Sequence, residues 1–210
     1  MTLLLPARPP PHRRPMPPVR ISVDQYHRMI ATGIIPEGDP IELLDGQLAR
    51  KDRSTQGEDP MSVGPQQSWV VNTLGRSDAK LVRLGCHMQN QQPLSLPPVD
   101  EPEPDGMVVR GQIDDFKDRK PTAADVLCVI EVADSSLADD RDRKQRIYAD
   151  HGIGQYLIIN LVDGLVEEYA EPEVGRGRYA RVTPFPAGKR VEIRTAAGKP
   201  LAVPVRSLLP

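Results

Sequence analysis

The chain has 210 residues, a length typical of one folded domain with a substantial core and a tail. Its formal net charge of −2 provides no overall positive field to attract a polyanion, so binding to nucleic acid would depend on a local patch of charge. No apolar stretch approaches the ~18 residues of a membrane span. The two cysteines, Cys86 and Cys128, suit a reducing compartment and form no disulfide framework, so we expect a cytoplasmic protein.

The first 20 residues are unsuited to core packing. They contain seven of the 23 prolines and several arginines, without any periodicity. This composition predicts an extended or disordered arm over residues 1–20. We expect the fold to begin near Ile21 and to form a single domain over residues 21–210 with a Pro-rich C-terminal extension.

Two helices and a hairpin are predicted in the first part of the domain. Ser22 at an N-cap position and Gly33 as a stop, with apolar residues at helical spacing between them, predict a short helix. Apolar runs on both sides of Asp45-Gly46 predict a hairpin. Apolar residues from Gln67 to Leu84 recur close to every 3.6 residues, which predicts a second helix.

Three strands are predicted next, separated by Pro-rich and charged loops, at residues 87–96, 105–111 and 125–133. The last contains the uninterrupted apolar run Val126–Ile130, which is typical of a central strand buried on both faces.

A helix over residues 135–152 follows, in which Ser136 is expected to cap, with Asp139 three residues on. A hairpin around Asp163-Gly164 and weak strands at 179–182 and 190–194 complete the pattern. This order predicts a mixed α/β sheet with helices on its faces.

Glu131 directly follows the buried apolar run. An ionised carboxylate there needs a charged partner, hydrogen bonds or a metal to offset its desolvation, unless the strand end simply faces water. The strand alone leaves these two interpretations about equal.

Lys144 lies on the helix that follows Glu131. It precedes Ile147 and Tyr148 by three and four residues and therefore shares their apolar face. Such a lysine usually extends along the apolar face to water. The helix, however, returns over the strand it follows, so Lys144 and Glu131 are expected to meet.

Asp105 stands just before an apolar strand, in "EPEPDGMVVR". Pro-Asp-Gly by itself indicates only a turn. A neighbouring strand of the same sheet would nevertheless bring Asp105 beside Glu131. Two carboxylates and a lysine at one edge of a sheet would suit a magnesium site with open water positions.

The segments "ELLDG", "EPD" before "VV", "VIEVADSS" and "DRDRKQRIYADHGIGQYLIIN" resemble the Uma-two family of restriction-endonuclease-like proteins, a branch of the PD-(D/E)XK nuclease superfamily. The resemblance covers about residues 21–170. It implies a nuclease fold, DNA as the substrate, Mg²⁺ or Mn²⁺ as the cofactor, and a homodimer. The superfamily usually places its lysine two positions after the acidic residue, where this chain has Ala133, and Lys144 matches the lysine that the family moves to the next helix.

The resemblance also implies roles for individual residues. Asp105 and Glu131 would bind the metal with the backbone carbonyl of Val132. Lys144 would orient or help to deprotonate the attacking water, and it would stabilise charge on the phosphorane. Glu42 matches the acidic residue near the start of the superfamily core, which binds a second metal or a metal-bound water.

Two positions depart from the family pattern. Gln67 stands where many relatives carry a histidine, and Gln47 replaces a glutamate that often follows the "LLDG" turn. A nuclease-fold module with little or no activity, serving in nucleic-acid or protein binding, therefore remains the alternative to an active endonuclease.

Other charged residues suggest no competing site. The four histidines lack metal-ligand spacing, which argues against a zinc site. The C-terminal region is the most cationic part of the fold, and we interpret it as a solvated hairpin in preference to a phosphate-binding loop. Its basic residues are Arg176, Arg178, Arg181, Lys189, Arg190 and Arg194.

Overall fold

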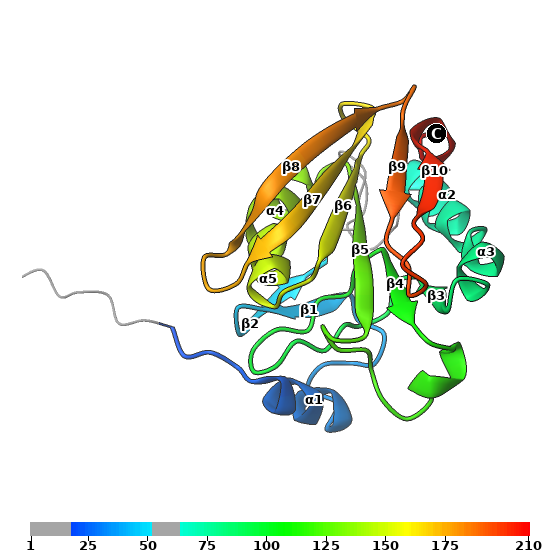
Figure 1. Ribbon diagram of the computed structural model, residues 1–210. Coiled ribbons are helices and arrows are strands. Elements are labelled where there is room, and N and C mark those ends of the chain that lie inside the picture. The colour runs from blue at the N-terminus through cyan, green and yellow to red at the C-terminus, as the bar shows by residue number, and fades with distance from the viewer. Residues whose placement is uncertain (1–17, 52–63) are drawn as a thin grey trace, which may run out of the picture.

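A computed structural model describes residues 18–51 and 64–210. Its centre is a six-stranded sheet in the order β3-β4-β5-β6-β7-β8, in which β5 and β6 are parallel and the other neighbours are antiparallel (Figure 1). The predicted mixed α/β sheet is confirmed. The strands are β3 (Cys86–Gln89), β4 (Gly106–Arg110), β5 (Val126–Ala133), β6 (Gln155–Asn160), β7 (Leu165–Glu173) and β8 (Arg178–Pro186).

Strand β5 is buried on both faces, as its apolar run predicts. Successive side chains alternate between two hydrophobic cores, so that Ile130 enters one and Val129 the other. Glu131 projects from the same face as Val129. A carboxylate therefore stands on a core-facing position near the middle of the sheet.

Each core is closed by a separate group of elements (Figure 1). One face is covered by the helices α2 (Pro65–Gly75) and α3 (Asp78–Val82), the ribbon of β9 (Arg190–Ile193) and β10 (Leu201–Pro204), and the 3₁₀ turn η3 (Val205–Leu208). The other face is covered by the helical segment that connects β5 to β6. This segment consists of α4 (Leu137–Asp139), the π-helical turn η2 (Asp140–Lys144) and α5 (Gln145–Asp150).

The N-terminal elements form as their sequence predicts. Helix α1 (Val23–Ala31) begins with a capping box in which Gln25 N–H donates to Ser22 Oγ at 3.2 Å. The hairpin of β1 (Ile41–Leu44) and β2 (Gln47–Arg50) turns at Asp45-Gly46, where both residues have positive φ, as a type I′ turn requires. The hairpin around Asp163-Gly164 is also present, between β6 and β7.

Two predicted elements are shorter than expected. The helix predicted from Gln67 to Leu84 is divided into α2 and α3, because the chain turns at Arg76-Ser77 and the Asp78 side chain accepts from Met88 N–H at 2.9 Å. The strand predicted over residues 87–96 ends at Gln89, because Gln91 has a φ of 50° and breaks the extended backbone. A single 3₁₀ turn, η1 (Ile113–Phe116), follows β4.

The connecting helix and the C-terminus differ from prediction as well. Ser136 has helical dihedrals and does not cap; its hydroxyl donates to Asp140 Oδ2 at 2.7 Å. The C-terminal extension contains β10, which pairs with β9, although its prolines gave no indication of a strand. The reason is that Pro204 lies at the end of β10, where its missing N–H breaks no internal ladder bond.

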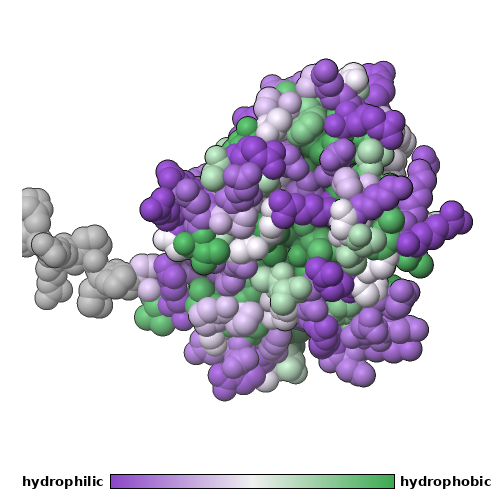
Figure 2. Space-filling model, viewed as in Figure 1, coloured by the Kyte–Doolittle hydropathy of each residue, from purple (hydrophilic) through white to green (hydrophobic). Residues whose placement is uncertain are grey.

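The surface is predominantly polar, with small apolar areas between hydrophilic side chains on the face shown in Figure 2. In the described parts of the chain, no helix has the length and apolar character needed to cross a bilayer. Both cysteines are buried and free. The division into an arm of residues 1–20 and a domain of residues 21–210 stays a prediction, since residues 1–17 lie outside the described residues.

Candidate active site

The antiparallel pairing of β4 with β5 brings two predicted carboxylates together. Gly106 pairs with Ile130, so Asp105 and Glu131 are placed at the same end of the two strands. Asp105 N–H donates to Glu131 Oε2 at 3.3 Å, and Val132 N–H donates to Asp105 Oδ2 at 2.9 Å. Both side chains are 2% exposed, which excludes the interpretation that Glu131 simply faces water.

Lys144 reaches this pair from the connecting helix. Its Nζ donates to Glu131 Oε1 at 3.0 Å, and the Tyr148 hydroxyl donates to the same oxygen at 2.8 Å. The π turn Asp140–Lys144 immediately precedes α5, and Asp140 and Lys144 face the same cavity, with Nζ 3.9 Å from Asp140 Oδ1. Single π turns of this kind occur frequently at functional sites.

Glu42 approaches from β1, outside the central sheet. Its Oε1 lies 3.5 Å from Lys144 Nζ, and its Oε2 accepts from Glu103 N–H at 2.8 Å. A two-pronged ion pair between Arg146 and Asp45 (2.9 and 2.5 Å) joins the β1–β2 hairpin to the helical segment between β5 and β6. Arg143 adds a bond to Leu44 O at 2.7 Å. Arg143 and Arg146 therefore hold the hairpin against the helix and are not merely solvated.

A second lysine in the site escaped the sequence analysis. Lys51 directly follows β2 and is 6% exposed; its Nζ lies 3.2 Å from Asp105 Oδ1 and donates to Glu103 O at 2.6 Å. A lysine at a strand end carries no pattern that distinguishes it from a solvated one. Gln67, on α2, donates to Asp105 Oδ2 at 3.1 Å, whereas Gln47 is exposed on β2.

The site forms a cavity of about 280 Å³. Five carboxylates and four cationic side chains line it, so it is close to electrically neutral when all are ionised. The acids are Glu42, Asp105, Glu131, Asp139 and Asp140, and the bases are Arg50, Lys51, Arg143 and Lys144.

Burial and charge shift the titration of these groups in opposite directions. Burial raises the pKa of Glu131 to about 8 against the opposing effect of the Lys144 ammonium, and it raises the pKa of Asp140 to about 6. Burial also acts on Asp105, but the ammonium groups of Lys51 and Lys144 outweigh it and hold the pKa of Asp105 below its ordinary value. For Lys144, burial is outweighed by the surrounding carboxylates, chiefly Glu131, which hold its pKa well above the usual value.

The donor set suits a hard cation that keeps several waters. Asp105 Oδ1 is buried and accepts no hydrogen bond from the described residues, although Lys51 forms an ion pair with it. In a β-strand the N–H and C=O groups of one residue point to the same side of the strand. Val132 N–H points toward Asp105, and the Val132 carbonyl therefore points to that side as well. One or two carboxylates with additional oxygens are the usual protein ligands of Mg²⁺.

As they stand, the described residues contain no group of three or more His, Cys, Asp or Glu side chains arranged to hold a metal ion. Two lysines instead lie among these carboxylates. Lys144 lies between Glu131 and Glu42, and Lys51 lies against Asp105. Binding an ion would therefore require the carboxylates to exchange part of these lysine contacts.

A mixed sheet with a parallel β5–β6 pair, two acids at neighbouring strand ends and a lysine on the connecting helix define a restriction-endonuclease-like protein. The chain belongs to the family described as "Uma2: Putative restriction endonuclease", which matches residues 23–204. The match confirms the family that the sequence motifs suggest.

A solved structure with the same fold is "a putative nuclease belonging to DUF820" from Anabaena variabilis. The TM-score is 0.63 at 13% identity, over 90% of this chain and 97% of that chain. At this identity the similarity establishes the fold alone. No curated protein matches the chain significantly.

Three of the six basic residues in the cationic C-terminal region pair with neighbouring acids. Arg176 and Arg178 contact Glu173, and Arg181 contacts Glu168 and Glu171. These exposed pairs favour the solvated-hairpin interpretation.

Proposed function

We propose that the protein is a divalent-metal-dependent endonuclease that hydrolyses phosphodiester bonds of DNA. The observation that carries this proposal is the convergence of Asp105, Glu131 and Lys144 in one cavity, with a buried Asp105 oxygen that accepts no hydrogen bond from the described residues. Asp105, Glu131 and the Val132 carbonyl would hold Mg²⁺ or Mn²⁺, and Glu42 would contribute to a second ion or bind water.

The charge of the cavity supports a phosphodiester substrate. The nearly balanced acids and bases that line it leave little net charge, so a bound dication would make the cavity positive. A positive, recessed site attracts a phosphate group and stabilises charge that develops during in-line attack. The dication when bound would act as a Lewis acid on the phosphate.

Lys144 is suited to orient water and to stabilise negative charge. Because the surrounding carboxylates hold its pKa well above the ordinary value, it remains an ammonium that donates hydrogen bonds. It is therefore poorly suited to take a proton from water.

We assign proton acceptance to Asp140. Its Oδ1 is buried and accepts no hydrogen bond from the described part of the chain, and its pKa of about 6 lies close to the working pH of a cytoplasmic enzyme. Gln67 cannot fill this role, because an amide nitrogen is only a donor and an amide oxygen is not basic.

Nicking of supercoiled plasmid in Mg²⁺ or Mn²⁺ tests the proposal. The parent protein is expected to nick, whereas Glu131→Gln and Lys144→Met are expected to be inactive. Lys117→Met provides the matched control, because Lys117 is 67% exposed and its ion pair with Asp114 lies at the surface, outside the cavity. Thermal melting of each variant verifies that it is folded at the assay temperature.

The outcomes separate the two candidate functions. Nicking by a folded Lys144→Met variant would contradict the role of this lysine. Absence of nicking by the parent under all metal conditions would favour the nuclease-fold binding module. The proposed homodimer, which would pair two active sites on two strands, is tested by sedimentation in the presence and absence of duplex DNA.

A further inference from the structure

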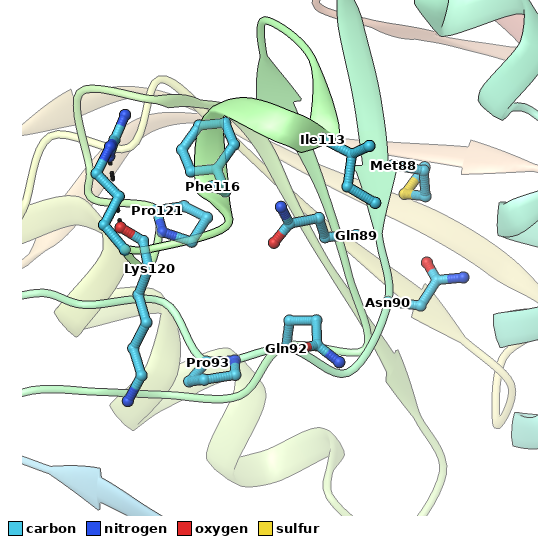
Figure 3. A pocket seen from close by; sticks show the side chains of 10 residues that line it. Met88, Gln89, Asn90, Gln92, Pro93, Ile113, Phe116, Lys120 and Pro121 are labelled. Carbon is cyan, nitrogen blue, oxygen red and sulfur yellow. Dashed lines mark hydrogen bonds between the residues drawn. The ribbon is translucent and has the colours of Figure 1, made fainter. Parts of the chain in front are cut away.

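A second cavity, of about 490 Å³, lies outside the candidate active site (Figure 3). Its volume is in the range of small-molecule sites. Figure 3 shows Phe116 and Pro121 on one side, Gln92 and Pro93 on the opposite side, and the Gln89 amide directed between them. The two sides thus combine the flat apolar rings of Phe116, Pro121 and Pro93 with the polar Gln92 side chain, and a hydrogen-bonding amide points between them.

The buried side chain of His87 fixes the orientation of the Gln89 amide. His87 Nδ1 lies 3.0 Å from the Gly111 carbonyl, which can only accept, so this nitrogen carries the proton. In the neutral ring Nε2 must then accept, and it lies 3.0 Å from Gln89 Nε2. The amide nitrogen is therefore committed to His87, and Gln89 presents its carbonyl oxygen and one remaining N–H to the cavity.

The cationic side chains at the cavity are already neutralised. Arg119 forms a two-pronged pair with Asp125 (2.7 and 3.0 Å), and Lys120 lies 2.5 Å from Glu101. A free phosphate or another anion would compete with these carboxylates. The cavity thus favours a neutral, flat ligand with an adjacent donor and acceptor on its edge.

This cavity opens from the same sheet face as the active site. Gln89 pairs with Met107, which pairs with Val129, and Glu131 is two residues farther along β5. With strands about 4.8 Å apart and about 3.4 Å per residue, the Cα atoms of Gln89 and Glu131 are separated by about 12 Å. A backbone hydrogen bond also joins the segment that lines the cavity to the active site, because Gln91 N–H donates to the Asp105 carbonyl at 3.3 Å.

We propose that this cavity binds an unpaired nucleobase of the nucleic-acid substrate, a few nucleotides from the cleaved phosphate. The inference rests on the proposed nuclease function. The base would lie between Phe116 and the Pro93 wall and would pair through its edge with the Gln89 amide. An amide offers one acceptor and one donor, which every base can match, so the cavity selects for an unpaired base and not for one sequence. Phe116 supplies a single stacking surface.

Anisotropy binding in EDTA tests this assignment without cleavage. The probes are a labelled single-stranded 10-mer of mixed sequence, a 10-mer of the same length made only of abasic residues, and a 10-base-pair duplex. The phosphates of the two single strands are equivalent, so their difference reports base contacts. We expect the base-containing strand to bind roughly tenfold more tightly than the abasic strand, a ratio in the range of one base stacked on an aromatic side chain.

Two variants locate this difference in the cavity. Gln89→Met keeps the length of the side chain but removes its donor and acceptor, and Phe116→Leu removes the aromatic wall. Each is expected to lower the preference at least threefold. Gln47→Met is the matched control, because Gln47 is exposed on a strand and does not line this cavity.

An abasic strand that binds within twofold of the base-containing strand would overturn the assignment, as would an unchanged preference in folded Gln89→Met. Duplex binding as tight as that of the single strand would also contradict it. Failure of the nuclease proposal is distinguishable, because the binding assay contains no metal. A base preference without nicking supports the cavity alone, whereas nicking without a base preference supports the active site alone.

Discussion

Metal binding by this protein should depend strongly on pH. Burial raises the pKa of Glu131 to about 8, so in the free protein this carboxyl binds a proton far more readily than an exposed glutamate does. A metal ligand must be deprotonated, and the ion and the proton therefore compete for Glu131. The affinity for Mn²⁺ should rise with pH up to about 8 and level off above it.

The magnitude follows from the pKa. Between pH 8 and pH 6 the ionised fraction of Glu131 falls from about one half to about one hundredth, so the Kd for Mn²⁺ should increase by roughly 50-fold. If Mn²⁺ is present at about 100 times its Kd at pH 8, it stabilises the fold by about 2.7 kcal/mol, and at pH 6 by only about 0.6 kcal/mol. For a chain of this size these values correspond to shifts in Tm of about 5–11 °C and about 1–3 °C.

Thermal melts with and without Mn²⁺ at pH 6, 7 and 8 measure this effect. Subtracting the Tm without Mn²⁺ from the Tm with Mn²⁺ at each pH removes the contributions of titrating groups that the ion does not affect. Glu131→Gln should show little Mn²⁺ stabilisation at any pH. Asp139→Asn should retain the parent behaviour, because Asp139 is exposed at the rim of the cavity. Equal Mn²⁺ shifts at pH 6 and pH 8, or a full shift in Glu131→Gln, would refute the reasoning.

Three further predictions concern single side chains of the site. Lys144→Met should lower the free energy of unfolding in urea by about 3–5 kcal/mol, because buried carboxylates lose their cation; a loss below about 1 kcal/mol would show that the ion pairs contribute little. Asp105 has a depressed pKa, so its stabilisation is present above the unfolded pKa and is lost as pH falls through the folded pKa. Lys51→Met raises that folded pKa and should move acid unfolding, followed by circular dichroism, to higher pH; an unchanged midpoint would contradict the pairing. Asp140→Asn should lower the nicking rate by about 10²–10⁴-fold and remove the rise in rate near pH 6, and a retained rise would exclude Asp140 as the proton acceptor.

Local patterns determined much of the fold. The apolar run Val126–Ile130 predicts a strand buried on both faces, because no alternation with polar residues marks a solvated side. Asp45-Gly46 predicts a tight hairpin, since both residues accept positive φ. Ser22 predicts the start of α1, because its hydroxyl can accept from the first turn. Each of these features depends on a few consecutive residues.

Within the candidate site, the sequence indicated the residues and the meeting of Glu131 with Lys144 and Asp105, but not the geometry of these contacts. Glu131 and Lys144 were identifiable because each interrupts an apolar pattern. Their contact of 3.0 Å was expected from the return of the helix over β5, whereas nothing in the sequence indicated the π turn that carries Lys144. The position of Asp105 just before an apolar strand suggested it as a neighbour of Glu131, and the pairing of β4 with β5 places the two side by side.

The tertiary structure alone decided the remaining features. Lys51 reaches Asp105 because the β1–β2 hairpin, held by Arg146 and Asp45, lies against the connecting helix. Strand β10 forms because β9 offers it a free edge, which outweighs the unfavourable propensity of proline. These contacts join residues that are far apart in the chain, and a sequence pattern of short range contains no information about which distant partners will meet.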